Sequence, residues 1–236
     1  MDPINALFVW LSQPARWQGV DSIPNRISEH LLMSGVTLLI SLVLAMPIAL
    51  YLGHIGRGAN LAINIANVGR AIPSLAFLAF ALPISFAFGL GLGFWPTVIA
   101  LVPLAFPLLF VNTITAMREV DADILEAARA MGLSGWQVFQ NVELPLGAPL
   151  ILAGIRNATV GIVATATLGA LVAGGGLGRF LIDGLARREN ERLITGAILV
   201  AVLAIFVEVF FSVLERIARP KQGEIESQET VTSTAH

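Results

Sequence analysis

The sequence contains no cysteine, a single lysine at position 221 and only three histidines. Without cysteine there are no disulfides, no thiol catalysis and no thiolate metal sites. The lone lysine does not stand in a Gly-x-x-x-x-Gly-Lys motif followed by Ser or Thr, so the chain has no phosphate loop for ATP. The histidines form no His-x-x-x-His pair, and no metal site is expected.

Charge is scarce as well. Charged residues make up 13% of the chain, against roughly 25% in a soluble domain. The formal net charge of -2 offers no basic surface for nucleic acid. No set of nucleophile, base and orienting group can be assembled from the sequence, so no catalytic residues are expected. Hydrophobic residues, in contrast, make up 56% of the chain and gather in long runs.

These apolar runs are long enough to cross a bilayer, which takes about 20 residues per helix. Residues 31–53 contain no charged side chain and predict one span. The uncharged residues 71–117 predict two, separated by a break rich in glycine and proline. The predicted fold is an all-α polytopic membrane protein whose termini lie on opposite sides. Its five spans are expected over residues 31–53, 60–82, 95–117, 147–172 and 193–214.

The two ends of the chain differ from the spans. Residues 1–26 lack the features of a secretory signal, because no basic residue precedes Arg16 and the apolar run is short. Trp10 and Trp17 favour a segment lying on the outer membrane surface, where indoles prefer the headgroup region; a frayed terminus is the alternative. Residues 218–236 are polar and predict a disordered tail.

The polar stretch 118–145 predicts a folded element outside the bilayer. Asp121 is placed to cap a helix over residues 122–131, and Gly132 can end that helix in the left-handed conformation. A simple connector would be shorter, so a rigid helix–turn–helix is expected.

The second helix of this element has its own signals. Ser134 and Gln137 form a capping box at its start. Pro145 is expected to end it and to lead into the next span.

Residues of fixed spacing lie in this stretch: Glu126-Ala127-Ala128, three residues, Gly132, nine residues, then Val142-Glu143-Leu144-Pro145. The pattern resembles the Glu-Ala-Ala loop of ATP-binding-cassette (ABC) importer permeases, with Val142 where isoleucine is common. The resemblance implies a cytoplasmic loop that docks into a groove on a separate ATPase subunit. The residues it assigns to this coupling loop are Glu126, Ala127, Ala128, Gly132, Leu144 and Pro145.

Other motifs resemble permeases for osmoprotectants such as glycine betaine, carnitine and choline. They are Ile72-Pro73-Ser74-Leu75-Ala76, Ala153-Gly154-Ile155-Arg156 and Gly174-Gly175-Gly176-Leu177-Gly178. The similarity covers residues 27–217 and implies a permease domain of the type I ABC importer fold.

The same resemblance implies the partners and the orientation. ATP and Mg would be bound by the partner ATPase, so this chain itself carries no cofactor. An extracytoplasmic solute-binding protein and a second permease chain, identical or a close paralogue, would complete the importer in the lipid of the bacterial inner (plasma) membrane. Basic residues are divided evenly between the two sides, so the orientation rests on the loop: N-terminus outside, C-terminus cytoplasmic.

Three other functions are weighed. A permease of the same fold could carry another small solute, such as methionine. A stand-alone channel or secondary transporter often shows an inverted repeat, and none is seen here. A membrane enzyme would need the catalytic set that is missing. With a single tyrosine, an aromatic cage for a quaternary ammonium is expected in the binding protein instead.

Three charged residues fall inside the predicted spans at similar depth in the inner half: Arg70, Arg156 and Glu208. An unpaired charge there costs about 2.5–3.5 kcal/mol or more. We therefore expect Glu208 to pair with Arg156, or failing that with Arg70. The pair is either purely structural, or one arginine stands at an inner gate. With Pro73 and Asn157, these residues are the candidate pathway or gate.

Two further surfaces are predicted. Asn157, Gly161, Thr165 and Gly169 share one helix face, which either packs within the chain or lines the seam between two permease chains. After residues 174–176, a helix with an apolar face is expected in the outer interface, on the side that in this family receives the binding protein. The apolar face consists of Leu177, Phe180, Leu181 and Leu185.

Overall fold

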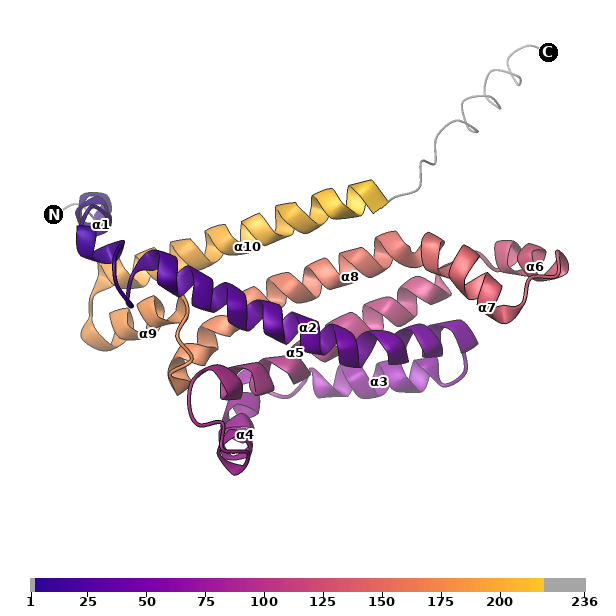
Figure 1. Cartoon of the computed structure of the whole chain (residues 1–236), viewed down its shortest axis with the longest axis horizontal. Coiled ribbons are helices and arrows are strands. Elements are labelled where there is room, and N and C mark those ends of the chain that lie inside the picture. Colours follow the sequence, from indigo (N-terminus) through magenta and orange to yellow (C-terminus); the bar gives the residue numbers. More distant parts are fainter. Residues whose placement is uncertain (1–2, 219–236) are drawn as a thin grey trace, which may run out of the picture.

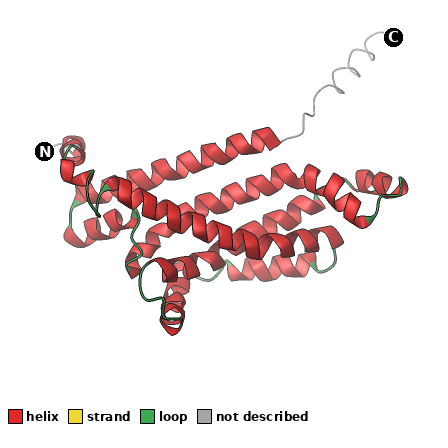
Figure 2. Cartoon of the chain, in the orientation of Figure 1, coloured by secondary structure: helices red, strands yellow, loops and turns green. Residues whose placement is uncertain are grey.

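The computed structural model describes residues 3–218, and within this range the chain is helical with no strand (Figure 2). The elements in chain order are α1 (Pro3–Leu11), η1 (Pro14–Arg16), α2 (Ile23–Ile55), α3 (Ala59–Gly69), α4 (Ser74–Ala87), α5 (Phe94–Arg118), α6 (Ala122–Ala130), α7 (Gly135–Val138), η2 (Phe139–Glu143), α8 (Leu144–Thr165), η3 (Ala166–Val172), α9 (Gly178–Arg187) and α10 (Asn190–Ala218).

Four helical stretches are long and apolar enough to cross a membrane: α2, α5, α10 and the run Gly135–Val172 that contains α8. They lie along the long axis of the molecule (Figure 1). In this bundle α2 contacts α5, α5 contacts α8, and α8 contacts α10. A fifth span is counted only if the bent pair α3 and α4 is taken as one. The all-α membrane fold predicted from the sequence is therefore confirmed.

Local signals set the first helical hairpin. The Ser22 side chain accepts a hydrogen bond from the Asn25 N–H and so caps α2. At the other end Gly56 has φ of 68° and Gly58 has φ of 75°. Glycine adopts this left-handed region at little cost, so the chain turns sharply there into α3.

Small side chains fill the centre of the bundle. Ala45 and Ala49 of α2, Ala59 and Ala66 of α3 and Ala158 of α8 are buried together with large side chains of α5. Small residues let membrane helices approach closely, and α5 is accordingly the central helix. In contrast, only 6% of the apolar window of α10 is buried within the chain, so that helix offers most of its surface to lipid or to a partner.

The predicted helix over residues 60–82 is wrong as a single straight span. Instead, α3 and α4 meet at an angle of 87°. Pro73 has no N–H to donate, and a proline disfavours helical geometry in the residue before it, here Ile72. As a result α4 leaves the bundle and projects from it (Figure 1), with Phe80 66% and Phe86 58% exposed.

The N-terminal segment is helical and packed against the protein. Trp10 was expected at the membrane surface, but it is buried and meets Phe180 of α9 edge to face at 6.0 Å. The Arg16 guanidinium lies 4.2 Å from the centre of the Trp10 ring. Trp10 is buried because packing a large ring between α1, α9 and α10 stabilises the protein more than placing the ring among lipid headgroups would. Trp17 does stay exposed.

The predicted tail, from residue 219 on, lies outside the described residues.

The two ends of the bundle carry different elements. At one end lie α1 and α9, and at the other lie α6 and α7 (Figure 1). Helix α10 starts beside α9 and runs back toward the end that carries α6 and α7. The folded loop and the N-terminal segment are thus separated by the full length of the long helices.

Candidate functional site

The loop motif begins on a helix with the predicted caps. Helix α6 starts after Asp121, whose carboxylate accepts a hydrogen bond from the Asp123 N–H at 2.8 Å. Gly132 follows with φ of 85°, and a Cβ added there would meet nothing within 4 Å. A side chain at this position would be excluded by backbone conformation and not by lack of space. The predicted helix over 122–131 is confirmed to within one residue.

The capping box is confirmed too. The Ser134 N–H donates to Gln137 Oε1 at 2.8 Å, and the Gln137 N–H donates to Ser134 Oγ at 3.4 Å. Pro145, however, does not end the second helix. A π turn, η2, joins α7 to α8, and residues 135–172 form one helical run. The π turn widens the helix just before the proline, where a standard turn would clash with its ring.

The motif side chains divide into an outer and an inner set. Glu126, Ala127 and Gly132 are exposed on the loop. Ala128 is only 2% exposed and so packs within the chain. Of the two residues at the other end of the motif, Leu144 is half-buried and Pro145 is exposed. The role of these residues in docking a partner remains a prediction.

Large apolar side chains accompany the motif on the loop surface. Ile124 is 45%, Met131 75% and Trp136 64% exposed. Exposed apolar surface on a polar, rigid element is typical of a protein interaction site. The loop therefore carries exposed apolar side chains that a protein partner could cover.

A buried carboxylate at the base of the loop was missed from the sequence. Glu143 is 2% exposed, and its Oε2 lies 2.5 Å from Nδ1 of His54 at the end of α2. The signal available was an acidic side chain between Val142 and Leu144, directly before a membrane span. Its partner, His54, lies 89 residues away along the chain, so no local sequence pattern identifies the pair.

The predicted intramembrane ion pair is confirmed. Arg156 Nη1 of α8 lies 3.5 Å from Glu208 Oε1 of α10. Two partners on α10 were not foreseen: Glu215 Oε2 at 3.3 Å and Ser212 Oγ, which accepts a hydrogen bond at 2.9 Å. Ser212 and Glu215 follow Glu208 by four and seven residues, so all three share one face of α10. This helical spacing is the sequence signal from which the two additional partners could have been predicted.

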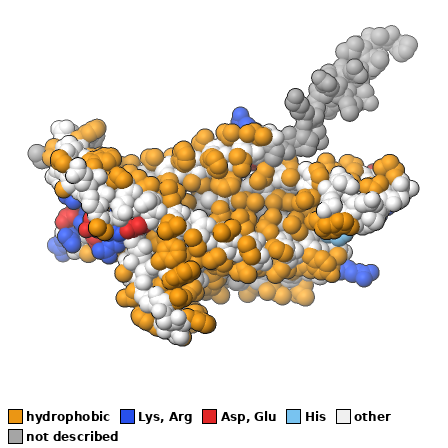
Figure 3. All heavy atoms as spheres, in the orientation of Figure 1, with side chains coloured by type: hydrophobic (Ala, Val, Ile, Leu, Met, Phe, Trp, Pro, Cys, Tyr) orange, Lys and Arg blue, Asp and Glu red, His pale blue; other side chains and the backbone are white. Residues whose placement is uncertain are grey.

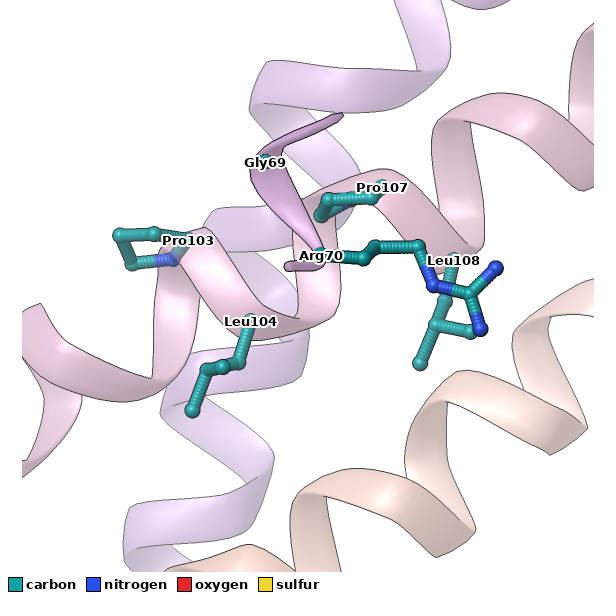
Figure 4. Close-up of a pocket in the computed structure, with 6 residues that line it drawn as sticks. All are labelled: Gly69, Arg70, Pro103, Leu104, Pro107 and Leu108. Atoms are coloured by element: carbon teal, nitrogen blue, oxygen red, sulfur yellow. The ribbon is translucent and has the colours of Figure 1, made fainter. Parts of the chain in front are cut away.

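Arg70 lies apart from this cluster. Among the described residues, no carboxylate is within 4.0 Å of its guanidinium. It is exposed at the end of α3 and borders a cavity of about 150 Å³ (Figure 4), where its side chain runs across α5 toward Leu108. The cavity is lined by Gly69, Arg70, Pro103, Leu104, Pro107 and Leu108.

The other two candidate pathway residues also lie apart. Pro73 directly precedes α4, at the break in the second span. Asn157 is exposed on α8. The structure thus brings Arg156 and Glu208 together, whereas Arg70 and Pro73 lie at the break between α3 and α4 and Asn157 is exposed on α8.

The small-residue face of the fourth span packs mainly within the chain. A Cβ on Gly161 would lie 3.6 Å from Leu108, and one on Gly169 would lie 2.7 Å from Thr97 Oγ1. Both neighbours belong to α5. Of the two predicted alternatives, internal packing is what these glycines show, and the exposed Asn157 is the part of this face that remains free for a partner.

Charged side chains gather at the end that carries α9 (Figure 3). Glu29 of α2 accepts a hydrogen bond from the Gly176 N–H at 2.8 Å and pairs with Arg26 at 2.6 Å. Arg26 also pairs with Asp21, and its hydrogen bond holds the pKa of the Asp21 carboxyl below the ordinary value of 3.8. The glycine segment after η3 is therefore fixed by side chains of α2.

The amphipathic helix predicted after this glycine segment is confirmed as α9, with one correction. Leu177 and Phe180 are buried, but Leu185 is 68% exposed. On the polar side Asp183 pairs with Arg179 at 3.3 Å and with Arg192 at 3.0 Å. The buried side chains point at α1 and α10, so the apolar face is used for packing within the chain.

Residues 38–220 match the family described as binding-protein-dependent transport system inner membrane component. A relative named glycine betaine/carnitine/choline transport system permease protein OpuCB, from Bacillus subtilis, is 35% identical over 196 residues, 83% of this chain and 88% of that protein. The carnitine transport permease protein OpuCB of Listeria monocytogenes is 36% identical over 193 residues, 82% of this chain and 86% of that protein.

A solved structure supports the fold. The inward-facing MetNI methionine ABC transporter contains a chain that matches with a TM-score of 0.74 at 23% identity, covering 93% of this chain and 100% of that one. At this identity the likeness concerns the arrangement of the helices alone. The family match covers well over half of the sequence, including the loop, the intramembrane charges and every long helix in part or whole. This chain belongs to the family of binding-protein-dependent transport system inner membrane components and is a membrane-embedded transport permease.

Proposed function

We propose that this chain is the permease subunit of an ATP-driven ABC importer for osmoprotectants of the glycine betaine, choline and carnitine type. The observation that carries the proposal is the capped, exposed loop around Glu126 and Gly132, which stands outside the apolar bundle. The solute class follows from relatives such as OpuCB of Bacillus subtilis, which shares 35% of its residues over most of both chains.

In this proposal the loop docks into a groove on an ATPase subunit, which binds ATP and Mg. Two permease chains form the path, and closure of two ATPase subunits moves both loops. Because packed helices switch between discrete arrangements, that motion changes which side of the membrane the path opens to. The permease itself hydrolyses nothing.

The proposed orientation places the loop in the cytoplasm and α1 and α9 outside a bacterial inner membrane. The charged end formed by Arg26, Glu29, Asp183 and Arg192 then faces the extracytoplasmic solute-binding protein. Complementary charges steer and align protein partners, so a polar end surface suits a partner that must dock and leave in each cycle.

The proposed path runs beside the broken span. Interrupted membrane helices are a frequent feature of substrate pathways, since irregular backbone is tolerated where it lines a cavity. Arg70 stands at this break and borders the cavity in Figure 4. A positive charge in this position would hinder leakage of cations while the importer is idle.

The test is Gly132→Val in the complete importer, reconstituted in proteoliposomes with its ATPase and binding protein. The left-handed backbone at Gly132 makes this change distort the loop, so uptake of labelled glycine betaine should fall while ATP hydrolysis continues. Gly89→Val is the matched control, since Gly89 also has a positive φ, of 69°, with nothing near its Cβ position. Normal uptake by Gly132→Val would count against the coupling loop. Uptake of methionine but not of betaine, carnitine or choline would overturn the solute class.

A further inference from the structure

Three helix ends meet tightly beneath the loop. A Cβ on Gly53 of α2 would lie 2.6 Å from Met117 Cβ of α5, and one on Gly147 of α8 would lie 3.3 Å from the Ala116 carbonyl oxygen. Gly53 and Gly147 are both buried. Because these backbones approach so closely, α2, α5 and α8 cannot slide past one another at this level without repacking.

His54, the next residue of α2, holds the base of the loop on several sides. Its Nδ1 lies within hydrogen-bond distance of Glu143 Oε2, at 2.5 Å. Its ring meets Phe139 edge to face at 5.5 Å, and Phe139 stacks on Trp136 at 5.3 Å. Its Nε2 lies 3.8 Å from the place a Cβ on Gly135 would take. A single side chain of α2 thus contacts Phe139 and Glu143 of η2 and lies beside the start of α7.

Breaking the contact between His54 and Glu143 is energetically unfavourable. A carboxylate that is 2% exposed loses its hydration, and leaving it without a partner is costly. Hydrogen bonds to an ionised group are roughly twice as strong as neutral ones. When the loop shifts, Glu143 shifts with it, and the lowest-energy response is for His54 to follow.

We propose that His54 and Glu143 are positioning residues that carry the displacement of the coupling loop into α2. This inference rests on the proposed function, in which the ATPase moves the loop. Helix α8 receives that motion directly, because η2 and α8 form one helical run. Helix α2 has no such chain connection, since His54 and Glu143 are 89 residues apart. The pair adds a direct polar link between the loop and α2 to the close packing of the helix ends, so that α2 tilts together with α8.

The transport test uses the reconstituted importer and three variants. His54→Ala removes the donor and should lower the ratio of glycine betaine uptake to ATP hydrolysis about tenfold, equivalent to about 1.4 kcal/mol. His54→Asn keeps an N–H near the position of Nδ1 and should retain most of the ratio. Asn60→Ala is the matched control, since it removes another side-chain hydrogen bond at the same end of the bundle, from Arg118, and should leave the ratio unchanged. All ratios are taken per inserted complex.

A second measurement needs no ATPase. The chain has no cysteine, so Tyr51→Cys and Met131→Cys, both at exposed positions, allow a spin-label distance between α2 and the loop. His54→Ala should broaden this distance distribution, whereas His54→Asn and Asn60→Ala should not.

The results of these experiments test the role of His54 separately from the proposed docking of the loop. An unchanged uptake ratio in His54→Ala overturns the inference, and so does an equal loss in His54→Ala and His54→Asn with no broadening. If Gly132→Val leaves coupling intact, the proposed docking loop is wrong. In that case the spin-label distances still decide whether His54 holds the loop to α2.

Discussion

Arg156 is the charge that ties α8 to α10. Its guanidinium faces two carboxylates, Glu208 at 3.5 Å and Glu215 at 3.3 Å. The Glu215 side chain is 12% exposed and the Glu208 side chain 46%. Since Glu215 lies closer to the guanidinium and is more enclosed by the chain, the pair with Glu215 should contribute more than the pair with Glu208. The residue expected from the sequence is thus the weaker of the two partners.

The first prediction concerns this cluster. Arg156→Met should lower the free energy of unfolding by about 2 kcal/mol, less than the roughly 3–5 kcal/mol of a fully buried pair because the groups are partly exposed. Glu208→Gln should cost less than Glu215→Gln. Thermal unfolding in detergent measures all three. The exchanged pair Arg156→Glu with Glu208→Arg should recover less than full stability, because Glu215 would then face a carboxylate. A larger loss in Glu208→Gln than in Glu215→Gln would contradict this ranking.

At the scale of the elements, η3 can approach α5 closely because residue 169 is a glycine and has no side chain. Gly169 lies against Thr97, which is fully buried at 0% exposed. The Thr97 hydroxyl is itself bonded to the Gly93 carbonyl oxygen at 2.8 Å, so it has little freedom to move aside. The small-residue stripe predicted on the fourth span therefore acts here as an internal helix contact.

A second prediction follows for this contact. Gly169→Ala should destabilise the protein by about 1–3 kcal/mol, since a methyl group overfills a packed site. Gly35→Ala on α2 is the matched control. A Cβ there meets nothing within 4 Å, and alanine favours a helix by up to about 1 kcal/mol over glycine. Equal melting temperatures for the two variants would contradict the packing argument.

The outer end of α2 gives a third prediction, on pH. The hydrogen bond from Arg26 lowers the pKa of Asp21 in the folded protein. A carboxyl with a lowered folded pKa stabilises the protein above its unfolded pKa, here near 3.8, and loses that contribution as the pH falls through the folded value. Asp21→Asn should therefore reduce thermal stability slightly at about pH 7, and by progressively less as the pH falls below 3.8 toward the folded pKa of Asp21. The effect is small because the Asp21 side chain is 79% exposed. A difference that grows on acidification would contradict it.

At the scale of the whole molecule, much apolar surface has no partner within the chain. Helix α4 projects from the bundle and exposes Phe80 and Phe86, and Phe88 just after it is 76% exposed. The cavity beside Arg70 opens on the same break. In the proposed importer, two chains that face each other would cover this surface and enclose the path.

The fourth prediction is that the assembled importer holds two permease chains, either two copies of this 25.1 kDa chain or one copy with a close paralogue. Native mass spectrometry of the complex in detergent measures this number. If the exposed face of α4 is the contact with the second chain, a charged substitution there, for example Phe80→Glu, should reduce the yield of the assembled complex because a buried unpaired charge is costly. A mass that corresponds to a single permease chain would reject the prediction.

From the sequence alone we could predict the membrane class, the starts of the two loop helices and the loop motif. Each of these depends on residues close together along the chain: runs such as 31–53 without charge, Asp121 before its helix, or Ser134 with Gln137 three residues later. The sequence also predicted that Glu208 pairs with an arginine, because an unpaired charge within an apolar run is costly.

Which distant groups meet depends on the packing of the whole chain. Arg156 lies 56 residues from Ser212, and His54 lies 89 residues from Glu143. Trp10 is buried because α9 and α10 offer a gap its size, and α4 turns away by 87° although its composition fits a straight span. The hydrophobic effect depends on how much apolar surface is removed from water, and it does not specify which surfaces pack together. The direction of each helix, and with it the partner of each buried charge, comes only from packing the whole chain.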